Sequence, residues 1–353
     1  MTELLDVLKR RIRAGGPIPV SEYMSACLLH PQFGFYCRKD PFGSAGSFTT
    51  APEISQMFGE IVGMFLAQVW LDQNSPGEFT LAELGPGRGT LMADLLRSAR
   101  VVPGFREAAK VVLVEHSPEL KKRQLSSLDE RNIDWVNFSC DLPDKPLYLI
   151  ANEFFDALPV RQYVKRQSAI EEIRVGLDNG RLVPGISRLA PEAPDTRDSD
   201  IAGSEIVELR PSAEAVLRPI CEKISEFGGV ALIVDYGDWE IRGSTLQAVH
   251  RHGRVDPFSS PGCADISAHV DFKSLSGLAG EAAVTEMTTQ GEFLLRLGIR
   301  ERARKLSKNL KGRALEEHAA AFERLTSPEQ MGSLFKAVAF YSCHFPLPPG
   351  FSK

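Results

Sequence analysis

The sequence predicts an α/β fold built on a mainly parallel sheet, and three observations support this prediction. Between Phe79 and Asp235, short apolar runs of strand type alternate with helical runs, which is the order of a parallel sheet. These runs are apolar throughout, as expected of strands that are covered on both faces. The first run opens directly into a turn with three glycines and then a helix. Such a turn places a ligand at the carboxyl edge of the sheet.

The expected strands of this sheet are short and apolar. They are residues 79–84, 110–115, 134–138, 147–151 and 229–235. A further run near the end of the chain, 335–342 (FKAVAFYS), is expected to be a final strand that closes the sheet edge. The interval between the fourth and fifth strands is long, so we expect an insertion there, at about residues 160–228.

The insertion is expected to contain a small antiparallel excursion, a surface loop and a helix. Its expected parts are strands at 160–166 and 171–177, a turn at Asn179-Gly180, a polar loop at 184–204 and a helix from Pro211 to Glu226. Beyond the fifth strand, we expect a strand at 245–250 and a helix over 293–317 that is basic on one side. That basic side is explained by a solvated helix face or by a docking surface for an acidic partner.

Residues 1–75 are expected to form an N-terminal helical and lid segment, and residues 76–353 the core with its insertion. The first helix has Leu4, Leu5, Leu8 and Ile12 on one face and ends at Gly15-Gly16. Ser21 is expected to cap a second helix that runs to about Leu29. A third, strongly apolar helix is expected to begin at Pro52 and to pack beside the sheet.

The stretch between the second and third of these helices is crowded with glycine, proline and aromatic residues (HPQFGFYCRKDPFGSAGSFTTAPEI). One interpretation is a loop that its aromatic side chains pin to the core. The other is a lid over a ligand, since loops on rigid scaffolds often carry function. The sequence leaves both interpretations open.

Composition and charge exclude several classes of protein. The chain has 41 basic and 46 acidic residues, a formal charge of −5, which argues against nucleic acid as the main partner. No apolar run approaches the roughly 20 residues that a membrane span requires. The six cysteines form no CxxC pair, so we expect neither a disulfide framework nor a zinc site. The first residues do not resemble a signal or transit peptide, which favours the bacterial cytoplasm over a processed protein of the mitochondrial matrix.

The glycine turn indicates which ligand is bound. Gly85, Gly87 and Gly89 are spaced G-x-G-x-G, with Glu83 two residues before the first. A dinucleotide fingerprint would be G-x-G-x-x-G, and a P-loop would end in Gly-Lys-Ser/Thr. A second acid, Glu115, ends the next strand, where a carboxylate can accept hydrogen bonds from ribose hydroxyls. This pattern favours S-adenosylmethionine over NAD.

Polar side chains also follow the fourth strand, at the same carboxyl edge. Asn152, Glu153 and Asp156 are the candidates for binding the methyl acceptor or for catalysis. No metal is expected, because the histidines near residues 250–269 form no pattern with acidic residues. Polar groups gathered opposite the glycine turn predict an acceptor site there.

Four separated motifs together resemble the MidA-like family of class I methyltransferases. They are FGSAGSFTTAPEISQMFGE, ELGPGRGT, NEFFDALPVRQY and ADISAHVDF, and the resemblance extends over nearly the whole chain. It implies a seven-stranded Rossmann-like core with a helical and loop addition. It also implies protein arginine N-methylation, since the family includes a mitochondrial assembly factor that methylates a subunit of respiratory complex I. One position departs from the family, because Ser47 stands where an acid is expected.

The resemblance implies a role for each candidate. The loop residues Gly85, Pro86, Gly87 and Gly89 would hold the methionine end of the donor, with Glu83 near its ammonium group and Glu115 on its ribose. Paired carboxylates would hold a guanidinium group in line with the methyl group. Two alternatives stay open: a methyltransferase for a small molecule or another protein atom, and an assembly or scaffold protein that binds the cofactor without methyl transfer. The oligomeric state is left open.

Overall fold

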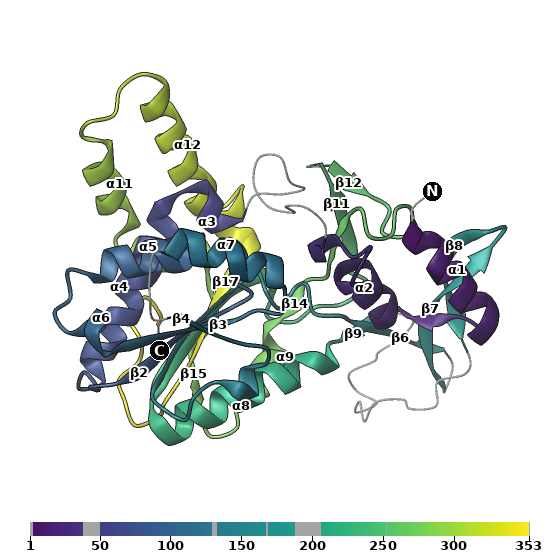
Figure 1. Cartoon of the computed structure of the whole chain (residues 1–353), viewed down its shortest axis with the longest axis horizontal. Helices are drawn as coiled ribbons and strands as arrows, with labels where there is room; N and C mark the ends of the chain where they lie inside the picture. The colour runs from purple at the N-terminus through teal and green to yellow at the C-terminus, as the bar shows by residue number, and fades with distance from the viewer. Residues whose placement is uncertain are drawn as a thin grey trace. The chain divides into compact units, whose positions relative to one another are not determined.

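The computed structural model describes residues 3–37, 50–128, 133–166, 169–187, 206–251 and 253–352 (Figure 1). The chain forms two compact units. Unit 1 comprises Met1–Phe48, Asp156–Glu214 and Glu240–Asp271, and unit 2 comprises Thr49–Phe155, Ala215–Trp239 and Phe272–Lys353. This division differs from the expected segments, 1–75 and 76–353. Residues 50–75 belong with the sheet of unit 2, and the N-terminal helices pack with the insertion.

The sheet of unit 2 is mainly parallel, as the sequence predicts. Its strands run in the order β15-β17-β10-β5-β2-β3-β4. Their bounds are β2 (Phe79–Leu84), β3 (Ala109–Val114), β4 (Ile133–Val136), β5 (Leu147–Asn152), β10 (Gly229–Asp238), β15 (Ala283–Val284) and β17 (Phe335–Tyr341). The pairs β4–β3, β3–β2, β2–β5 and β5–β10 are parallel, and β17 is antiparallel to β10. The α/β prediction is confirmed.

One expected detail of this sheet is wrong. The strand predicted at 335–342 does not close the sheet edge, because two short strands pair with its other side. These are β15, which pairs at Tyr341 and Phe340, and β16 (Thr288–Thr289), which pairs at Ala337 and Lys336. Strands of two residues carry too little periodicity to be recognised in a sequence.

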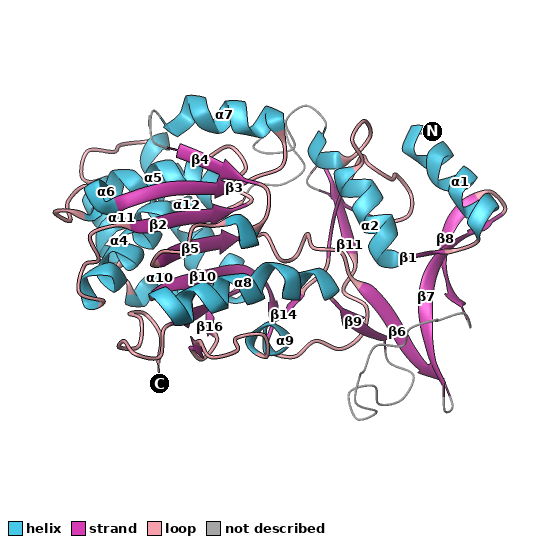
Figure 2. Ribbon diagram, turned by 60° about the horizontal axis from the view of Figure 1, so that its bottom comes forward, coloured by secondary structure: helices cyan, strands magenta, loops and turns pink. Residues whose placement is uncertain are grey.

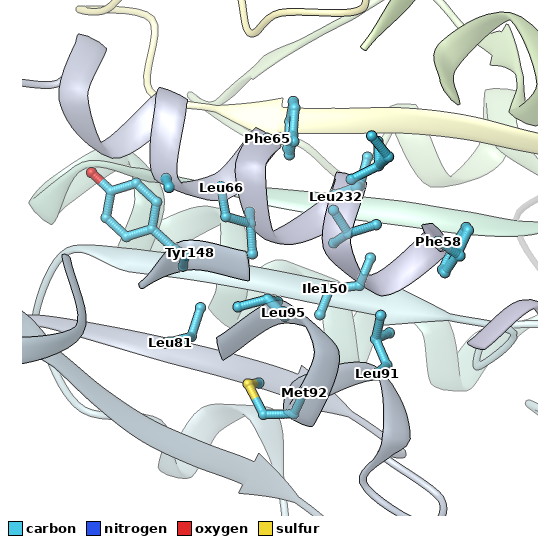
Figure 3. Packing of buried hydrophobic residues seen from close by; sticks show 14 of the residues in the cluster. Phe58, Phe65, Leu66, Leu81, Leu91, Met92, Leu95, Tyr148, Ile150 and Leu232 are labelled. Atoms are coloured by element: carbon cyan, nitrogen blue, oxygen red, sulfur yellow. The ribbon is translucent and has the colours of Figure 1, made fainter. Parts of the chain in front are cut away.

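Two helices, α4 (Gln56–Asp72) and α5 (Thr90–Ala99), pack against one face of the sheet (Figure 3). Phe58, Phe65 and Leu66 of α4 lie with Leu81, Tyr148 and Ile150 of the strands in one hydrophobic core. The two helices approach closely at glycines one turn apart: a Cβ atom on Gly59 would lie 2.6 Å from Cβ of Asp94, and one on Gly63 would lie 2.3 Å from Oγ of Ser98. This contact holds α5, and hence the glycine turn before it, at a defined height over the sheet. Figure 2 shows α8 (Pro211–Phe227), which the sequence predicts at almost these bounds, beside the strands of the same sheet.

Two expected helices are interrupted. The helix predicted from Pro52 is divided into α3 (Ala51–Ile54) and α4, because Ser55 is extended and its hydroxyl accepts a hydrogen bond from the N–H of Met57 at 3.2 Å. The helix predicted over 293–317 is three helices: α10 (Gln290–Arg296), α11 (Ile299–Ser307) and α12 (Arg313–Thr326). Glycines with positive φ precede the last two, Gly298 at +89° and Gly312 at +53°.

Unit 1 is built on an antiparallel sheet with the strand order β1-β7-β6-β9 and with β8 paired to β7. Its strands are β1 (Ile18–Pro19), β6 (Arg161–Arg166), β7 (Ala169–Asp178), β8 (Arg181–Ser187) and β9 (Ile206–Leu209). The predicted antiparallel excursion is therefore confirmed. The loop expected at 184–204 is wrong for 184–187, which extend β8 by pairing with β7, and residues 188–204 lie outside the described residues.

Two N-terminal helices complete the core of unit 1. They are α1 (Glu3–Gly15) and α2 (Val20–Leu29), and Leu4, Leu8 and Ile12 of α1 are buried as predicted. The cap expected at Ser21 is wrong, since α2 already begins at Val20 after Pro19. The strand expected at 245–250 is β11 (Gln247–His250), which pairs with β12 (Gly253–Val255) and β13 (Asp265–Ser267). Among the residues described in either unit, no helix has the length and apolar character needed to cross a membrane.

Candidate functional site

The glycine turn joins the end of β2 to the start of α5, at the carboxyl edge of the parallel strands. All three glycines have positive φ: +57° at Gly85, +53° at Gly87 and +84° at Gly89. The N–H of Gly85 donates to the carbonyl of Val114 at 3.0 Å, so the turn starts as a continuation of the ladder with β3. A Cβ atom at Gly85 would lie 2.9 Å from the ring of Phe154, so this position has no room for a side chain unless the ring moves.

Glu83 lies under the first turns of α5. Side chains alternate along a strand, so Glu83 is on the same face of β2 as the core residues Phe79 and Leu81. Its side chain accepts a hydrogen bond from the backbone N–H of Met92. Its Oε2 atom is buried and has no hydrogen-bond partner among the residues that the structure describes. Burial raises the pKa of the Glu83 carboxyl to about 8, and the nearby Glu115 adds to the rise.

Glu115 follows β3 and is held by groups that the sequence analysis did not identify. Its Oε1 accepts from the N–H of Ser117 at 2.8 Å, and its Oε2 accepts from the side-chain amide of Gln124 at 3.2 Å. Burial raises the pKa of this carboxyl, against the effect of these hydrogen bonds. Each carboxylate oxygen has two lone-pair sites, so Glu115 keeps the capacity to accept from a ligand hydroxyl.

Gln124 links three parts of the site and was missed by the sequence analysis. It lies on α7 (Pro118–Leu128) and is fully buried. Besides Glu115, its amide nitrogen donates to the carbonyl of Gly87 at 2.9 Å, and its oxygen accepts from the indole of Trp135 at 2.8 Å. The one feature of the sequence that could have indicated Gln124 is a polar residue at a position where the helix faces the core.

Asn152 ends β5 on the same face as Glu83. In the β2–β5 register Glu83 is opposite Ile150, and Asn152 is the next residue of β5 on that face. The Asn152 amide nitrogen donates to Oε1 of Glu153 at 3.2 Å. Its Oδ1 atom is buried and, within the described ranges, has no hydrogen-bond partner. The carboxyl ends of two neighbouring strands therefore each present a buried acceptor oxygen.

Glu153 begins the turn after β5 with φ of +51°, a conformation that is uncommon outside glycine. An acid within β10 holds this turn: Asp235 accepts from the N–H groups of Phe154 at 3.1 Å and Phe155 at 2.8 Å. From the sequence, residues 229–235 are predicted only as a strand, and this role of Asp235 was not expected. The clue in the sequence is an acid in an otherwise apolar run, and the structure shows that this acid is fully buried. Local strain at such a position is often found at functional sites.

The segment that precedes α4 reaches both halves of this edge. The N–H of Ala51 donates to Oε1 of Glu153 at 3.0 Å. Two residues later, Glu53 accepts from the hydroxyl of Thr90 at 2.7 Å and forms an ion pair with Arg88 of the glycine turn at 3.4 Å. These contacts belong to the end of the loop that was interpreted as either pinned or a lid. Residues 38–49, including Ser47, lie outside the described residues.

Asp156, the third predicted acceptor-site residue, belongs to unit 1. Its carbonyl accepts from the N–H of Ala268 at 3.0 Å. Burial raises the pKa of its carboxyl to about 6, and Arg210 opposes the rise. Arg210 itself donates to the carbonyls of Leu158 and Ala268. The contacts described for Asp156 are therefore with groups of unit 1, whereas those described for Asn152 and Glu153 are with groups of unit 2.

The part of the chain that the structure describes contains no group of three His, Cys, Asp or Glu side chains that could hold a metal ion. Of the histidines considered above, His250 bonds to the carbonyl of Cys263 at 2.8 Å through Nδ1. The donor set of unit 2 instead suits an organic cation that also carries hydroxyl groups. Glu83 offers a buried acceptor for an ammonium group, Glu115 offers acceptors for hydroxyls, and the turn at Gly85 exposes backbone. These features fit S-adenosylmethionine.

Comparison with known proteins identifies relatives over most of the chain. Residues 61–291 match the family model described as "Putative S-adenosyl-L-methionine-dependent methyltransferase". The Xenopus tropicalis protein named "Protein arginine methyltransferase NDUFAF7, mitochondrial" is 35% identical over 94% of this chain and 84% of its own length. The Drosophila melanogaster homologue of that name is 33% identical over 96% of this chain and 84% of its own length.

A solved structure supports the same relationship. A Burkholderia thailandensis protein, described as a "likely methyl transferase" and crystallised with S-adenosylhomocysteine, superposes with a TM-score of 0.83. It is 28% identical to this chain, and the superposition covers 98% of this chain and 93% of that protein. The similarity therefore extends over both units and is not limited to the parallel sheet.

Proposed function

Because the chain belongs to the family of S-adenosyl-L-methionine-dependent methyltransferases, we propose that it methylates a nitrogen of arginine side chains in proteins. The methyl donor follows from the family. The acceptor is our proposal, and the curated relatives support it, since those from Xenopus and Drosophila are named protein arginine methyltransferases. Identity above 30% over more than nine-tenths of this chain makes a shared acceptor class the simplest expectation.

One structural observation carries this proposal. Glu83 Oε2 and Asn152 Oδ1 are both buried, both lack partners among the described residues, and lie on the same face of adjacent parallel strands. A buried polar atom without a partner costs about 1–3 kcal/mol, so native structures keep few of them. Two such acceptor oxygens at one sheet edge fit two ligands that each supply N–H groups, the methyl donor at Glu83 and the methyl acceptor at Asn152.

The donor half consists of the glycine turn and two acids. We assign Glu83 to the ammonium group of the donor, because an ammonium group would satisfy Oε2 and favour the charged carboxylate. Glu115 is assigned to the ribose hydroxyls, with Gln124 holding its side chain toward the turn. Gly85, Pro86, Gly87 and Gly89 form the backbone surface against which the methionine part lies. When bound, S-adenosylmethionine supplies a methyl group on a positively charged sulfur.

The acceptor half consists of Asn152 and Glu153. An arginine side chain is protonated in water and is a poor nucleophile, so the protein must orient it. Asn152 Oδ1 is suited to accept from the N–H of the attacking nitrogen, and the Glu153 carboxylate is suited to pair with the guanidinium group. Orientation of this kind can contribute about 7–11 kcal/mol to catalysis. Methyl transfer would form a nitrogen–carbon bond and break the sulfur–methyl bond of the donor, which would leave as a thioether. One proton would pass from the nitrogen to a base, for which the Glu153 carboxylate is our candidate.

Asp156 keeps its predicted role as a proposal that can be tested alone. The prediction requires its carboxylate to help hold the acceptor; burial raises the pKa of this carboxyl, and the charge of Arg210 opposes the rise. Asp156→Asn should then keep donor binding and lose methyl transfer. Unchanged transfer by this variant would restrict the acceptor half to Asn152 and Glu153.

The decisive experiment transfers labelled methyl groups from S-adenosylmethionine into a host-cell lysate and identifies the labelled residue by mass spectrometry. Labelled arginine supports the proposal. Label on another residue or on a small molecule would replace it with the first alternative, and donor binding without any label would favour a scaffold that binds the cofactor. Glu153→Ala serves as the matched negative enzyme, because it should bind the donor and transfer nothing.

The same experiment names the target. We propose a subunit of a respiratory complex as the first candidate, because the resemblance to the MidA-like family implies a role in complex I assembly. The bacterial cytoplasm is our proposed location, and the mitochondrial matrix is the alternative, since the named relatives are mitochondrial. Cell fractionation of the native host would separate these two locations.

A further inference from the structure

The short helix α3 contacts the donor half and the acceptor half of the candidate site through two residues. Glu53 accepts from the hydroxyl of Thr90, the first residue of α5, at 2.7 Å, and pairs with Arg88 in the glycine turn at 3.4 Å. Ala51 donates its backbone N–H to Glu153 at 3.0 Å. Thr90 and Glu53 are 37 positions apart in the chain, so this contact exists only in the folded protein.

We propose that Glu53 is a positioning residue for methyl transfer, which sets the glycine turn and the Glu153 edge in one geometry through α3. The inference rests on the proposed function, because it assigns the turn to the donor and Glu153 to the acceptor. Glu53 itself belongs to neither half. Glu53 acts on the donor through Thr90 and Arg88, and α3 carries this constraint to Glu153 through Ala51.

Glu53 can have this effect because α3 is not stable as an isolated helix. A helix of four residues is too short to be stable by itself, so its position depends on what its residues contact. The Glu53 side chain is 19% exposed and accepts a charge-assisted hydrogen bond, the stronger class of such bonds. Without this acid, Thr90 loses the acceptor of its hydroxyl, and Arg88 loses its ion pair with Glu53. The first turn of α5 and the glycine turn are then held less firmly where the donor binds.

The chain offers a matched control two residues away. Ser55 caps α4 by accepting from the N–H of Met57 at 3.2 Å, and it contacts neither Thr90 nor Arg88 in any hydrogen bond described for it. Ser55→Ala should therefore lower the melting temperature without changing donor affinity. Glu53→Gln is the conservative variant, since its amide oxygen can still accept from Thr90 while the charge is lost.

The test measures binding of S-adenosylhomocysteine by calorimetry, which needs no methyl acceptor. We expect Glu53→Ala to weaken binding roughly tenfold or more, as loss of a charge-assisted hydrogen bond would. Thr90→Val should weaken binding by a similar factor. Glu53→Gln should bind more tightly than Glu53→Ala and less tightly than wild type, because its hydrogen bond to Thr90 remains but is no longer charge-assisted. Because both residues act through one contact, the double variant Glu53→Ala/Thr90→Val should be no weaker than the worse single variant.

The outcomes separate this inference from the proposed function. Wild-type protein that fails to bind S-adenosylhomocysteine would overturn the donor assignment itself. Normal binding by wild type and by Glu53→Ala would overturn only the role of Glu53. A parallel loss of affinity in Glu53→Ala and Ser55→Ala, in proportion to their melting temperatures, would also overturn it, because the effect would then be general destabilisation.

Discussion

The guanidinium of Arg302 on α11 donates two hydrogen bonds to the carboxylate of Glu60 on α4, from Nε to Oε2 and from Nη2 to Oε1, each 2.7 Å long. Glu60 is only 3% exposed and also accepts from Arg97 at 3.2 Å. This buried acid therefore fixes the start of the C-terminal helical pair α11 and α12, visible in Figure 1, to the helix that covers the sheet.

Arg302→Ala should lower the free energy of unfolding by about 1–3 kcal/mol. Removal of one partner of a buried ion pair costs about 3–5 kcal/mol, and the remaining Arg97 and the 31% exposure of the Arg302 side chain reduce that cost. Urea unfolding measures the change. Arg313→Ala is the matched control, because its pair with Glu317 is almost fully exposed and should contribute less than about 0.5 kcal/mol. Equal effects of the two variants would contradict this account.

Glu83→Gln should stabilise the protein without donor and weaken donor binding. The folded pKa of about 8 is above the ordinary value of 4.5, so between these values the unfolded chain binds fewer protons than the folded chain. Stability from this group is therefore present at low pH and is lost as pH rises toward 8. Glutamine does not ionise, so the variant does not lose this stability as pH rises. Its free energy of unfolding should exceed that of wild type by about 1–3 kcal/mol at pH 8 and by little at pH 5.

Donor binding gives an independent measurement on the same residue. An ammonium group next to Glu83 favours the carboxylate, so binding of S-adenosylhomocysteine at pH 7 should release a proton from wild type. Calorimetry in two buffers of different ionisation enthalpy counts this proton. Glu83→Gln should release none and bind more weakly. Proton release that persists in the variant would show that another group titrates.

Gly85→Ala should impair both folding and donor binding. The new Cβ would lie 2.9 Å from the Phe154 ring, and an alanine at φ of +57° costs about 1–2 kcal/mol. Gly180→Ala provides the comparison: φ is +76° there, and no atom lies within 4 Å of the added Cβ. Thermal melting of both variants isolates the backbone cost, and only Gly85→Ala should also lose affinity for S-adenosylhomocysteine. Equal affinity in the two variants would argue against a ligand at the turn.

Asp235→Asn should reduce methyl transfer far more than donor binding. Asp235 accepts from the N–H groups of Phe154 and Phe155 and so sets the turn that carries Glu153. Both of these N–H groups bond to Oδ2 of Asp235, and its Oδ1 accepts from the N–H of Tyr236 at 2.8 Å. An amide presents only one oxygen, so its NH2 group must face one set of these N–H donors, and we expect a loss of about 1–3 kcal/mol in stability and a misplaced acceptor edge. The exposed Asp238 on the same strand gives the control variant Asp238→Asn, which should behave as wild type in both assays.

Most of the candidate site could be predicted because its residues follow strands directly. Glu83, Glu115 and Asn152 each stand at a strand end, and strand ends of a parallel sheet meet at one edge. The residues that were missed act across long intervals of sequence. Gln124 bonds to Gly87, 37 positions away, and Asp235 bonds to Phe155, 80 positions away. No local sequence pattern predicts such a contact, because the partner of a buried polar residue comes from a distant segment of the chain.

By itself, the sequence determined the features that depend on neighbouring residues. These are the strand and helix order, the glycine turn after β2, and the acids at the strand ends. All of them arise from periodicity and from the backbone freedom of glycine, which act over a few residues. They sufficed to predict the sheet and its ligand edge.

Only the tertiary structure decided which polar atoms have partners. Among the described residues, Glu83 Oε2 and Asn152 Oδ1 have no hydrogen-bond partner, whereas Glu153 accepts from the N–H of Ala51, the first residue of α3. The structure also decided that β17 is not the edge strand, since β15 and β16 pair with it. Partnership depends on segments brought together from distant parts of the chain, and burial determines what an unpaired atom costs.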